Sequence, residues 1–407
     1  MNTMLNQDTF REATRLTRAG QLAEATALLR RMLRGESAPP HTRGPAAPAE
    51  REPPTIDAKA DPVAGPDAPH LEPATPAQPP NLRAPILRAL LDRAQISPGF
   101  SLPGAIKHGR PSTPDIVPKG ARFIEGTYSN AAGSRAYRLF IPSGYQEGQP
   151  IPLVVMLHGC TQSPDDFAAG TRMNLIAEEQ TCFVVYPAQR SDANQAKCWN
   201  WFRTTDQQRD GGEPSLIAGI TRQIMRDHSV DATRVYVGGL SAGAAAAAIM
   251  GATYSDLYAA IGVHSGLACG AAIDLPSAFA AMRQGGGFGD RVVPGDGSPV
   301  PTIVFHGDRD TTVHPNNGDQ ILDQFVRTTR TQTKVHRGQI PDGHAYTRTV
   351  HTDATGRGVL EHWNIHGAGH AWSGGSPAGS YTDPRGPDAT REMLRFFMEH
   401  SLPRKAG

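Results

Sequence analysis

The chain has 407 residues, of which 38% are hydrophobic, and its formal net charge is +1. This near-neutral charge gives no support for a nucleic-acid partner or a strongly charged substrate. Its 43 glycines and 35 prolines are many for one globular unit, so part of the chain is expected to remain unpacked.

The N-terminal residues and the cysteines give information on the cellular compartment. Residues 1–12 carry polar and acidic side chains where a secretion signal has an apolar core, so no signal peptide of the usual kind is expected. No apolar run in the sequence reaches the length of a transmembrane helix. Cys160, Cys182, Cys198 and Cys269 lack the spacing of metal ligands, and they allow one or two disulfides without requiring any.

Residues 1–35 are expected to form a helical hairpin, because two short apolar stripes lie on either side of Gly20. Such short helices cannot bury their stripes alone. The pair must therefore dock on the main domain, on a second copy or on another surface. Residues 36–118 are rich in proline and alanine and are expected to form a mostly disordered linker.

Residues 119–403 have the pattern of an α/β domain. Segments 123–128 and 134–141 alternate apolar and polar residues, which predicts a β-hairpin. Apolar strands then alternate with helices, which indicates a mostly parallel sheet covered on both faces. Strands are expected at Leu153–Leu157, Cys182–Tyr186, Val235–Val237, Ala259–His264 and Thr302–Phe305, and helices near Arg172–Glu179, Pro214–Arg226, Ala242–Ala252 and Asp319–Thr328. A second hairpin (345–350 with 359–365) and a last helix near 388–400 complete the domain.

A Gly-x-Ser-x-Gly motif at residues 239–243 follows a short β-branched strand and precedes an alanine-rich helix. This strand–turn–helix context predicts that Ser241 is a nucleophile held in a strained turn. The flanking glycines are needed because a Cβ there would collide with the neighbouring strand or helix. The alternative is a tight turn of small residues that only packs well.

The acid that holds the catalytic base is expected on the loop after strand 302–305. In α/β-hydrolases the order along the chain is Ser, then Asp or Glu, then His. The loop reads His306-Gly-Asp308-Arg-Asp310, so both aspartates qualify. Asp310 is preferred because it stands four places after the histidine and shortly before a Val-x-Pro turn. Asp308 would then cap a turn.

The base is expected on a late loop after the last strand. His370 follows a flexible Gly-Ala-Gly sequence and is preferred over His366 and His362, which lie nearer to or within the strand. The remaining histidines near these motifs are expected to be structural or to face the substrate; they are His158, His264, His306 and His314.

Two backbone N–H groups are expected to form an oxyanion hole. One belongs to Ala242, directly after the nucleophile, and the other to Cys160, in the loop after strand 153–157. A disulfide from Cys160 to Cys198 would pin that loop. Trp199, Trp201, Phe202 and Trp372 are candidates either for lining an acyl-binding cleft or for core packing. Neither a metal-ligand cluster nor a nucleotide-binding loop is found, so no cofactor is expected.

Seven short motifs in order resemble the esterase family named for poly(3-hydroxybutyrate) depolymerase. They are Leu157-His-Gly-Cys-Thr-Gln, Tyr186-Pro-Ala-Gln, Cys198-Trp-Asn-Trp-Phe, Gly239-Leu-Ser-Ala-Gly-Ala, His264-Ser-Gly-Leu, His306-Gly-Asp-x-Asp and Gly369-His-Ala-Trp. The resemblance covers roughly residues 121–402. It implies an α/β-hydrolase fold and a serine esterase with Ser241, Asp310 and His370 as its triad, and it assigns the oxyanion hole to the same two amides.

The resemblance implies hydrolysis of poly- or oligo(3-hydroxyalkanoate) esters. Feruloyl or acetylxylan ester hydrolysis is the alternative, because the wider family is similar to those esterases. A third hypothesis is a non-catalytic granule-binding protein. Secreted members carry signal peptides, whereas residues 1–118 resemble none. A cytoplasmic location is therefore favoured over an extracellular one, and the N-terminal helices are expected to bind a granule surface or another protein.

Overall fold

The computed structural model describes residues 116–286, 299–326 and 329–404. The predicted helical hairpin at residues 1–35, and all of the predicted linker except its last residues, lie outside these described residues. Within the described ranges, no helix combines the length and apolarity needed to span a bilayer.

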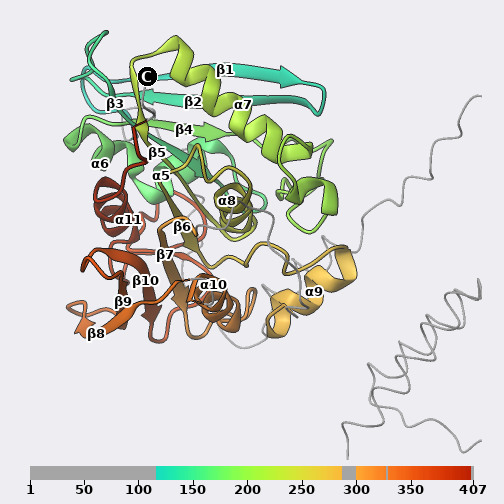
Figure 1. Ribbon diagram of the computed structural model, residues 1–407, viewed down its shortest axis with the longest axis vertical. Coiled ribbons are helices and arrows are strands. Elements are labelled where there is room, and N and C mark those ends of the chain that lie inside the picture. Colours follow the sequence, from blue (N-terminus) through green and yellow to red (C-terminus); the bar gives the residue numbers. More distant parts are fainter. Residues whose placement is uncertain (1–115, 287–298, 327–328, 405–407) are drawn as a thin grey trace, which may run out of the picture. The chain divides into compact units, whose positions relative to one another are not determined.

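The domain is built on one ten-stranded sheet with the order β1-β2-β4-β3-β5-β6-β7-β10-β9-β8 (Figure 1). The strands are β1 (Arg122–Asn130), β2 (Gly133–Ile141), β3 (Ile151–Leu157), β4 (Phe183–Pro187), β5 (Val230–Leu240), β6 (Ala260–His264), β7 (Thr302–Gly307), β8 (Gln332–Gln339), β9 (Ala345–Thr352) and β10 (Gly358–Ile365). The run from β4 to β10 is parallel, and an antiparallel pair extends the sheet at each edge. The central strands are buried along almost their whole length, as a parallel sheet with two covered faces requires.

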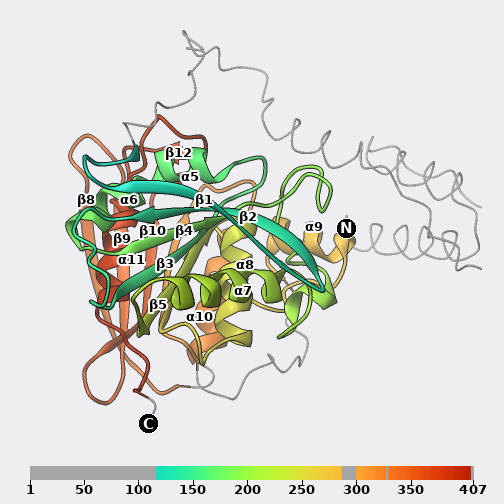
Figure 2. The same ribbon diagram turned by 90° about the horizontal axis from the view of Figure 1, so that it is seen from above.

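Helices cover both faces of the sheet, as the sequence predicted (Figure 2). One face carries α7 (Gly212–Asp227), α8 (Ala242–Thr253), α9 (Leu275–Gln284) and α10 (Asn316–Val326). The other carries α5 (Pro164–Thr171), α6 (Met173–Glu179) and α11 (Ala389–Met398). A 3₁₀-helix (Thr204–Gln207) precedes α7, and two-residue strands β11 (Trp372–Ser373) and β12 (Thr382–Asp383) form a small separate sheet.

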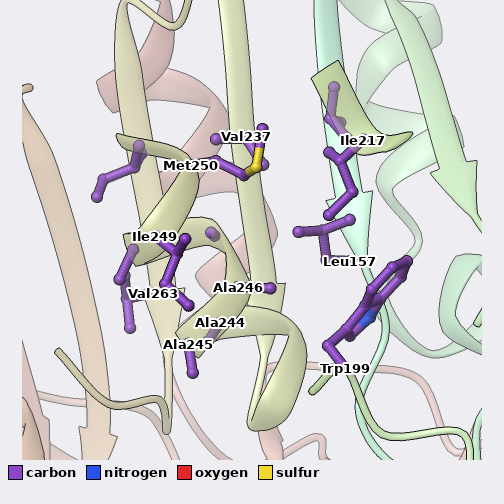
Figure 3. Packing of buried hydrophobic residues seen from close by; sticks show 14 of the residues in the cluster. Leu157, Trp199, Ile217, Val237, Ala244, Ala245, Ala246, Ile249, Met250 and Val263 are labelled. Carbon is purple, nitrogen blue, oxygen red and sulfur yellow. The ribbon is translucent and has the colours of Figure 1, made fainter. Parts of the chain in front are cut away.

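The core against α8 consists of small residues on the helix and branched residues on the strands. Ala244 and Met250 of α8 pack close to Val237 of β5 and Val263 of β6 (Figure 3). Alanine side chains let the helix axis approach the sheet closely. The first turn of α8 is thereby held directly over the ends of β3 and β5, where the candidate nucleophile lies.

The predicted strands and helices are present, with end shifts of a few residues and a β5 that is longer than expected. The helices α5 and α9 and the edge strand β8 were not predicted. Strand β8 is exposed along nearly its whole length, so it has no apolar alternation for sequence reasoning to detect. Helix α9 packs on the core through Ala278 and Ala281 and leaves Leu275 exposed, as described below.

A buried carboxylate joins the second half of the sheet to the last helix. Glu361 of β10 is 2% exposed and accepts hydrogen bonds from Arg348 of β9 and Arg395 of α11, both with shortest distances of 2.7 Å. Burial raises the pKa of Glu361, but the hydrogen bonds and charges of the two guanidinium groups outweigh it and leave the pKa lowered. The carboxylate is therefore ionised and paired in the folded protein.

We expect Glu361→Ala to lower the free energy of unfolding by about 3 kcal/mol, because it leaves two guanidinium groups without their buried partner. The measurement is urea unfolding at pH 7. Glu125→Ala is the matched control, because Glu125 pairs with Arg138 at 2.8 Å but its side chain is 80% exposed. Such surface pairs contribute little. An equal decrease in the free energy of unfolding in the two variants would contradict the assignment of Glu361 as a buried, stabilising ion-pair partner.

Candidate active site

Ser241 stands in a strained turn between β5 and α8. Its backbone has φ 57° and ψ −119°, a conformation that residues with a Cβ rarely adopt. A Cβ on Gly239 would lie 2.5 Å from the Leu157 carbonyl oxygen, and one on Gly243 would overlap that same oxygen. Both glycines of the motif are therefore required by close backbone contacts, as predicted.

The loop after β3 offers one free backbone donor beside Ser241. The Gly159 N–H donates to the side chain of Gln162, and the Thr161 N–H donates to the Ala196 carbonyl. Within the described residues, the N–H of Cys160 between them makes no backbone hydrogen bond. Ala242 is the first residue of α8, where N–H groups have no acceptor inside the helix. These two amides are the predicted oxyanion donors.

A disulfide joins Cys160 to Cys198, as the sequence suggested. It ties the β3 loop to the long segment that leads from β4 to α7. Cys182 and Cys269 are buried free thiols, and burial raises the pKa of the Cys269 thiol to about 12. The candidate oxyanion residue is thus covalently anchored, while the two free thiols lie protonated in the core.

His158 holds the same loop through a neutral ring. Its Nε2 accepts from the Gln189 N–H at 3.1 Å, so its Nδ1–H donates to the Gly159 carbonyl at 2.8 Å. Burial lowers its pKa to about 4. The indole of Trp199 donates to the His158 carbonyl at 3.1 Å and is fully buried. The expectation that Trp199 contacts substrate is therefore corrected: its indole packs beneath the loop.

Asp310 and His370 form the predicted acid–base pair. Asp310 follows β7, and its Oδ2 lies 2.7 Å from Nδ1 of His370. Its Oδ1 accepts from the N–H groups of Thr312 and Val313 at 2.9 and 2.8 Å. The carboxylate is thus held from both oxygens in one orientation, and the carboxylate in turn fixes the histidine ring.

His306, at the end of β7, lies next to this carboxylate and donates to a neighbouring carbonyl. Its Nε2 lies 2.8 Å from the Val313 carbonyl and 3.5 Å from Oδ2 of Asp310. Burial raises the pKa of Asp310, but the neighbouring imidazoles of His306 and His370 outweigh it and leave the pKa well below its usual range. Asp310 therefore stays ionised although it is buried.

Asp308 belongs to a different pair. Its carboxylate accepts from the Gly367 N–H at 2.7 Å and lies 3.0 Å from Nδ1 of His366. His366 in turn contacts Thr347 with its other nitrogen at 2.9 Å. Both side chains are more exposed than Asp310 and His370. The structure thus separates the two aspartates. Asp310 pairs with His370 as expected, whereas the pairing of Asp308 with His366 was not predicted, and His362 is in neither pair.

His264 connects the nucleophile's turn with the histidine loop. Its carbonyl accepts the Ser241 N–H at 2.9 Å, and its Nε2 accepts the Ser373 N–H at 3.0 Å. Its ring stacks on Trp372, with ring centroids 5.0 Å apart. Trp372 is 1% exposed and donates to Thr390, so its predicted contact with substrate is also corrected in favour of packing.

One mainly apolar cleft of about 180 Å³ opens beside Ser241. The acid loop, the disulfide and α9 all contribute to its walls. Its lining residues are Cys160, Asn194, Cys198, Trp201, Phe202, Ser241, Ala242, Leu267, Leu275, Ala278, Phe279, Met282, Arg283, Thr311, Thr312 and Val313. Of the predicted substrate-facing tryptophans, Trp201 alone is in this set. Sequence reasoning missed the contribution of α9 and of the threonines that follow Asp310.

Residues 135–335 match the family described as "Esterase PHB depolymerase", which confirms the resemblance predicted from the motifs. The chain is 35% identical over 244 residues to poly(3-hydroxyalkanoate) depolymerase C of Paucimonas lemoignei, and the match covers 56% of each chain. It is 27% identical over 203 residues to a probable acetylxylan esterase A of Aspergillus clavatus, covering 46% of this chain and 64% of that protein. The chain thus spans less than two thirds of these relatives.

Two further similarities bear on the fold and the family. The chain is 27% identical over 260 residues to feruloyl esterase B of Neurospora crassa, covering 60% of this chain and 82% of that protein. The solved acetyl xylan esterase from Aspergillus awamori superposes with a TM-score of 0.52 at 19% identity, over 68% of this chain and 99% of that one. This superposition confirms the predicted α/β-hydrolase fold.

We expect the free energy of unfolding to fall as the pH drops from about 6.5 to about 4. His158 titrates near 4 when folded and near 6.5 when unfolded, so the unfolded chain binds more protons in this window. His158→Asn should reduce the change in the free energy of unfolding within this window by about 1.4 kcal/mol per pH unit. The measurement is urea unfolding at several pH values.

His336→Asn is the control for this titration, because His336 is exposed on the edge strand β8. It should leave the slope unchanged. A wild-type slope that persists in the His158 variant would show that this ring is not the titrating group.

Proposed function

We propose that the described domain, whose residues 135–335 match the esterase family named for poly(3-hydroxybutyrate) depolymerase, is a serine hydrolase of carboxylic esters. The observation that carries the proposal is the pairing of the buried Asp310 with His370 at 2.7 Å, together with a Ser241 held in a strained turn. The residues directly after Asp310 line the same cleft as Ser241. A serine, a histidine and a buried carboxylate in this order along the chain are the requirements of a serine-esterase triad.

In the first step Ser241 Oγ attacks the ester carbonyl carbon. His370 accepts the hydroxyl proton on Nε2, because its Nδ1–H is directed at Asp310. The ionised Asp310 stabilises the imidazolium that forms. The N–H groups of Cys160 and Ala242 stabilise the oxygen that becomes negative. When the tetrahedral intermediate collapses, His370 returns the proton to the departing alcohol, and the acyl group stays on Ser241.

In the second step water replaces the alcohol. His370 removes a proton from the water, whose oxygen attacks the acyl-enzyme at the same carbonyl carbon. The same two N–H groups stabilise the second tetrahedral intermediate. Ser241 leaves as its hydroxyl after taking the proton from His370. The balance is one ester and one water converted to one acid and one alcohol.

The substrate class we propose is short hydroxyalkanoate esters. The cleft beside Ser241 is lined mainly by apolar side chains such as Phe279, Met282 and Trp201. Such walls suit aliphatic acyl chains better than sugar rings, which need more polar partners. The relative with 35% identity is named a poly(3-hydroxyalkanoate) depolymerase, which supports the same choice. Feruloyl and acetylxylan esters, suggested by the other relatives, are the alternative that a substrate panel separates.

We expect the protein to hydrolyse p-nitrophenyl butyrate and 3-hydroxybutyrate oligomers. Ser241→Ala should lower kcat by about 10⁶-fold, and Asp310→Asn by about 10⁴-fold. Asp308→Asn is the matched control, because it removes a carboxylate two residues away that pairs with His366 instead. It should keep activity close to wild type. The measurement is steady-state hydrolysis, with a fluorophosphonate probe to label Ser241.

Three outcomes would change this proposal. A folded wild type without hydrolysis or fluorophosphonate labelling would exclude a serine hydrolase. A larger loss in the Asp308 variant than in the Asp310 variant would reverse the assignment of the acid. Hydrolysis of feruloyl or acetyl sugar esters, with none of the hydroxybutyrate oligomers, would keep the triad and replace the substrate.

A further inference from the structure

Helix α9 presents an apolar stripe to the cleft, and the same face joins the core through Ala278 and Met282. Leu275, Ala278, Phe279 and Met282 follow the i, i+3, i+4, i+7 spacing of one helical face, and all four line the cleft beside Ser241. In Figures 1 and 2, α9 lies at the edge of the domain. Leu275 is 42% exposed. Part of the apolar stripe of α9 is therefore accessible to a ligand in the cleft.

The helix is firmly held in this position. Asp274 and Ser277 form a capping box at its N-terminus. At its C-terminus the Met282 carbonyl accepts the His314 N–H at 2.7 Å, and the side chain of Asn317 donates to the Ala281 carbonyl at 2.9 Å. The wall that α9 contributes is therefore fixed relative to the loop that carries Asp310.

Arg283 follows this stripe and is the one charged residue that lines the cleft within the described ranges. Its side chain is exposed and makes no hydrogen bond or ion pair with the part of the chain that the structure describes. The carbonyls of Ala281 and Met282 near the end of α9 already have the partners named above, so the side chain is not needed to cap these two. Within the described ranges, the five N–H donors of the guanidinium therefore have no protein acceptor at the edge of an apolar cleft.

We propose that Arg283 binds a carboxylate of the substrate and so selects hydroxyalkanoate oligomers with a free acid end. The apolar stripe of α9 contacts the hydrocarbon part of the oligomer, and the guanidinium pairs with its terminal carboxylate in a planar, bidentate fashion. A neutral ester of the same size fits the apolar wall but leaves the guanidinium unpaired. The inference rests on the proposed ester hydrolysis at Ser241 and adds a preference within it.

The test compares two substrates that differ at one end, the 3-hydroxybutyrate dimer with a free carboxylate and with a neutral methyl ester in its place, at pH 8. We expect Arg283→Ala to lower kcat/KM for the free acid by about five- to tenfold, mainly through KM. Its kcat/KM for the internal ester bond of the methyl ester should stay within about twofold of wild type. The kcat/KM of Arg283→Lys for the free acid should lie between the values of wild type and Arg283→Ala, because lysine keeps the positive charge but cannot form the bidentate contact.

Two further measurements sharpen the test. Raising the salt concentration to 0.5 M should reduce the preference of wild type for the free acid, because screening weakens an exposed ion pair. The same salt concentration should leave the ratio of the kcat/KM values for the free acid and the methyl ester unchanged in Arg283→Ala. Arg226→Ala is the control variant, since Arg226 is an exposed arginine of α7 that does not line the cleft. It should keep the wild-type ratio.

An unchanged ratio of the two kcat/KM values in Arg283→Ala would overturn the inference, whether both values fall together or neither changes. The proposed function is judged separately. Hydrolysis of the methyl ester by the Arg283 variants keeps the Ser241 esterase in place even when the charge preference is absent. Loss of all hydrolysis in wild type would instead remove the proposed function.

Discussion

The Leu157 carbonyl oxygen lies against the backbone of both Gly239 and Gly243, and this contact determines the geometry of the whole site. It brings the end of β3, the end of β5 and the first turn of α8 together at one point. No side chain beyond hydrogen fits between them, so the residue midway, Ser241, takes its strained conformation. The free N–H groups of the β3 loop and of α8 then lie next to the serine hydroxyl.

Around this contact, neutral histidines link loops that are distant in sequence. His158 joins the β3 loop to the segment after β4, and His264 joins the nucleophile's turn to Ser373 on the late loop. Burial holds the pKa of both rings far below the ordinary value, so each can accept a backbone N–H with one nitrogen. A charged ring would lose that acceptor, and the loops are thus connected by groups that stay neutral near pH 7.

The sequence was most informative where chemistry constrains the backbone locally. The Gly-x-Ser-x-Gly turn and the ends of the buried strands could be predicted because each depends on residues adjacent in sequence. The structure brings Asp310 and His370 together, and the catalytic roles of these two residues and of Ser241 stay predictions. The disulfide pairing was suggested correctly because both cysteines flank motifs of one site.

Properties that depend on tertiary packing could not be predicted in this way. An indole beside a motif can point into the cleft or beneath the loop, and Trp199 and Trp372 pack in the core while Trp201 lines the cleft. Helix α9 was missed although its apolar residues follow helical spacing, and the sequence could not show that this stripe lines a cleft made with other segments. The pairing of Glu361 with two arginines depends on three elements that meet only in the folded domain.

The disulfide between Cys160 and Cys198 makes the oxyanion loop depend on a covalent step that is separate from folding of the sheet. Two thiols must lose electrons to an oxidant before the loop is tied to the segment between β4 and α7. In a chain that keeps both thiols reduced, hydrogen bonds such as those of His158 and Trp199 alone would hold the loop. The redox potential of the surroundings would then set how well ordered the oxyanion donors are, and with them the turnover rate, in a domain whose core is already complete.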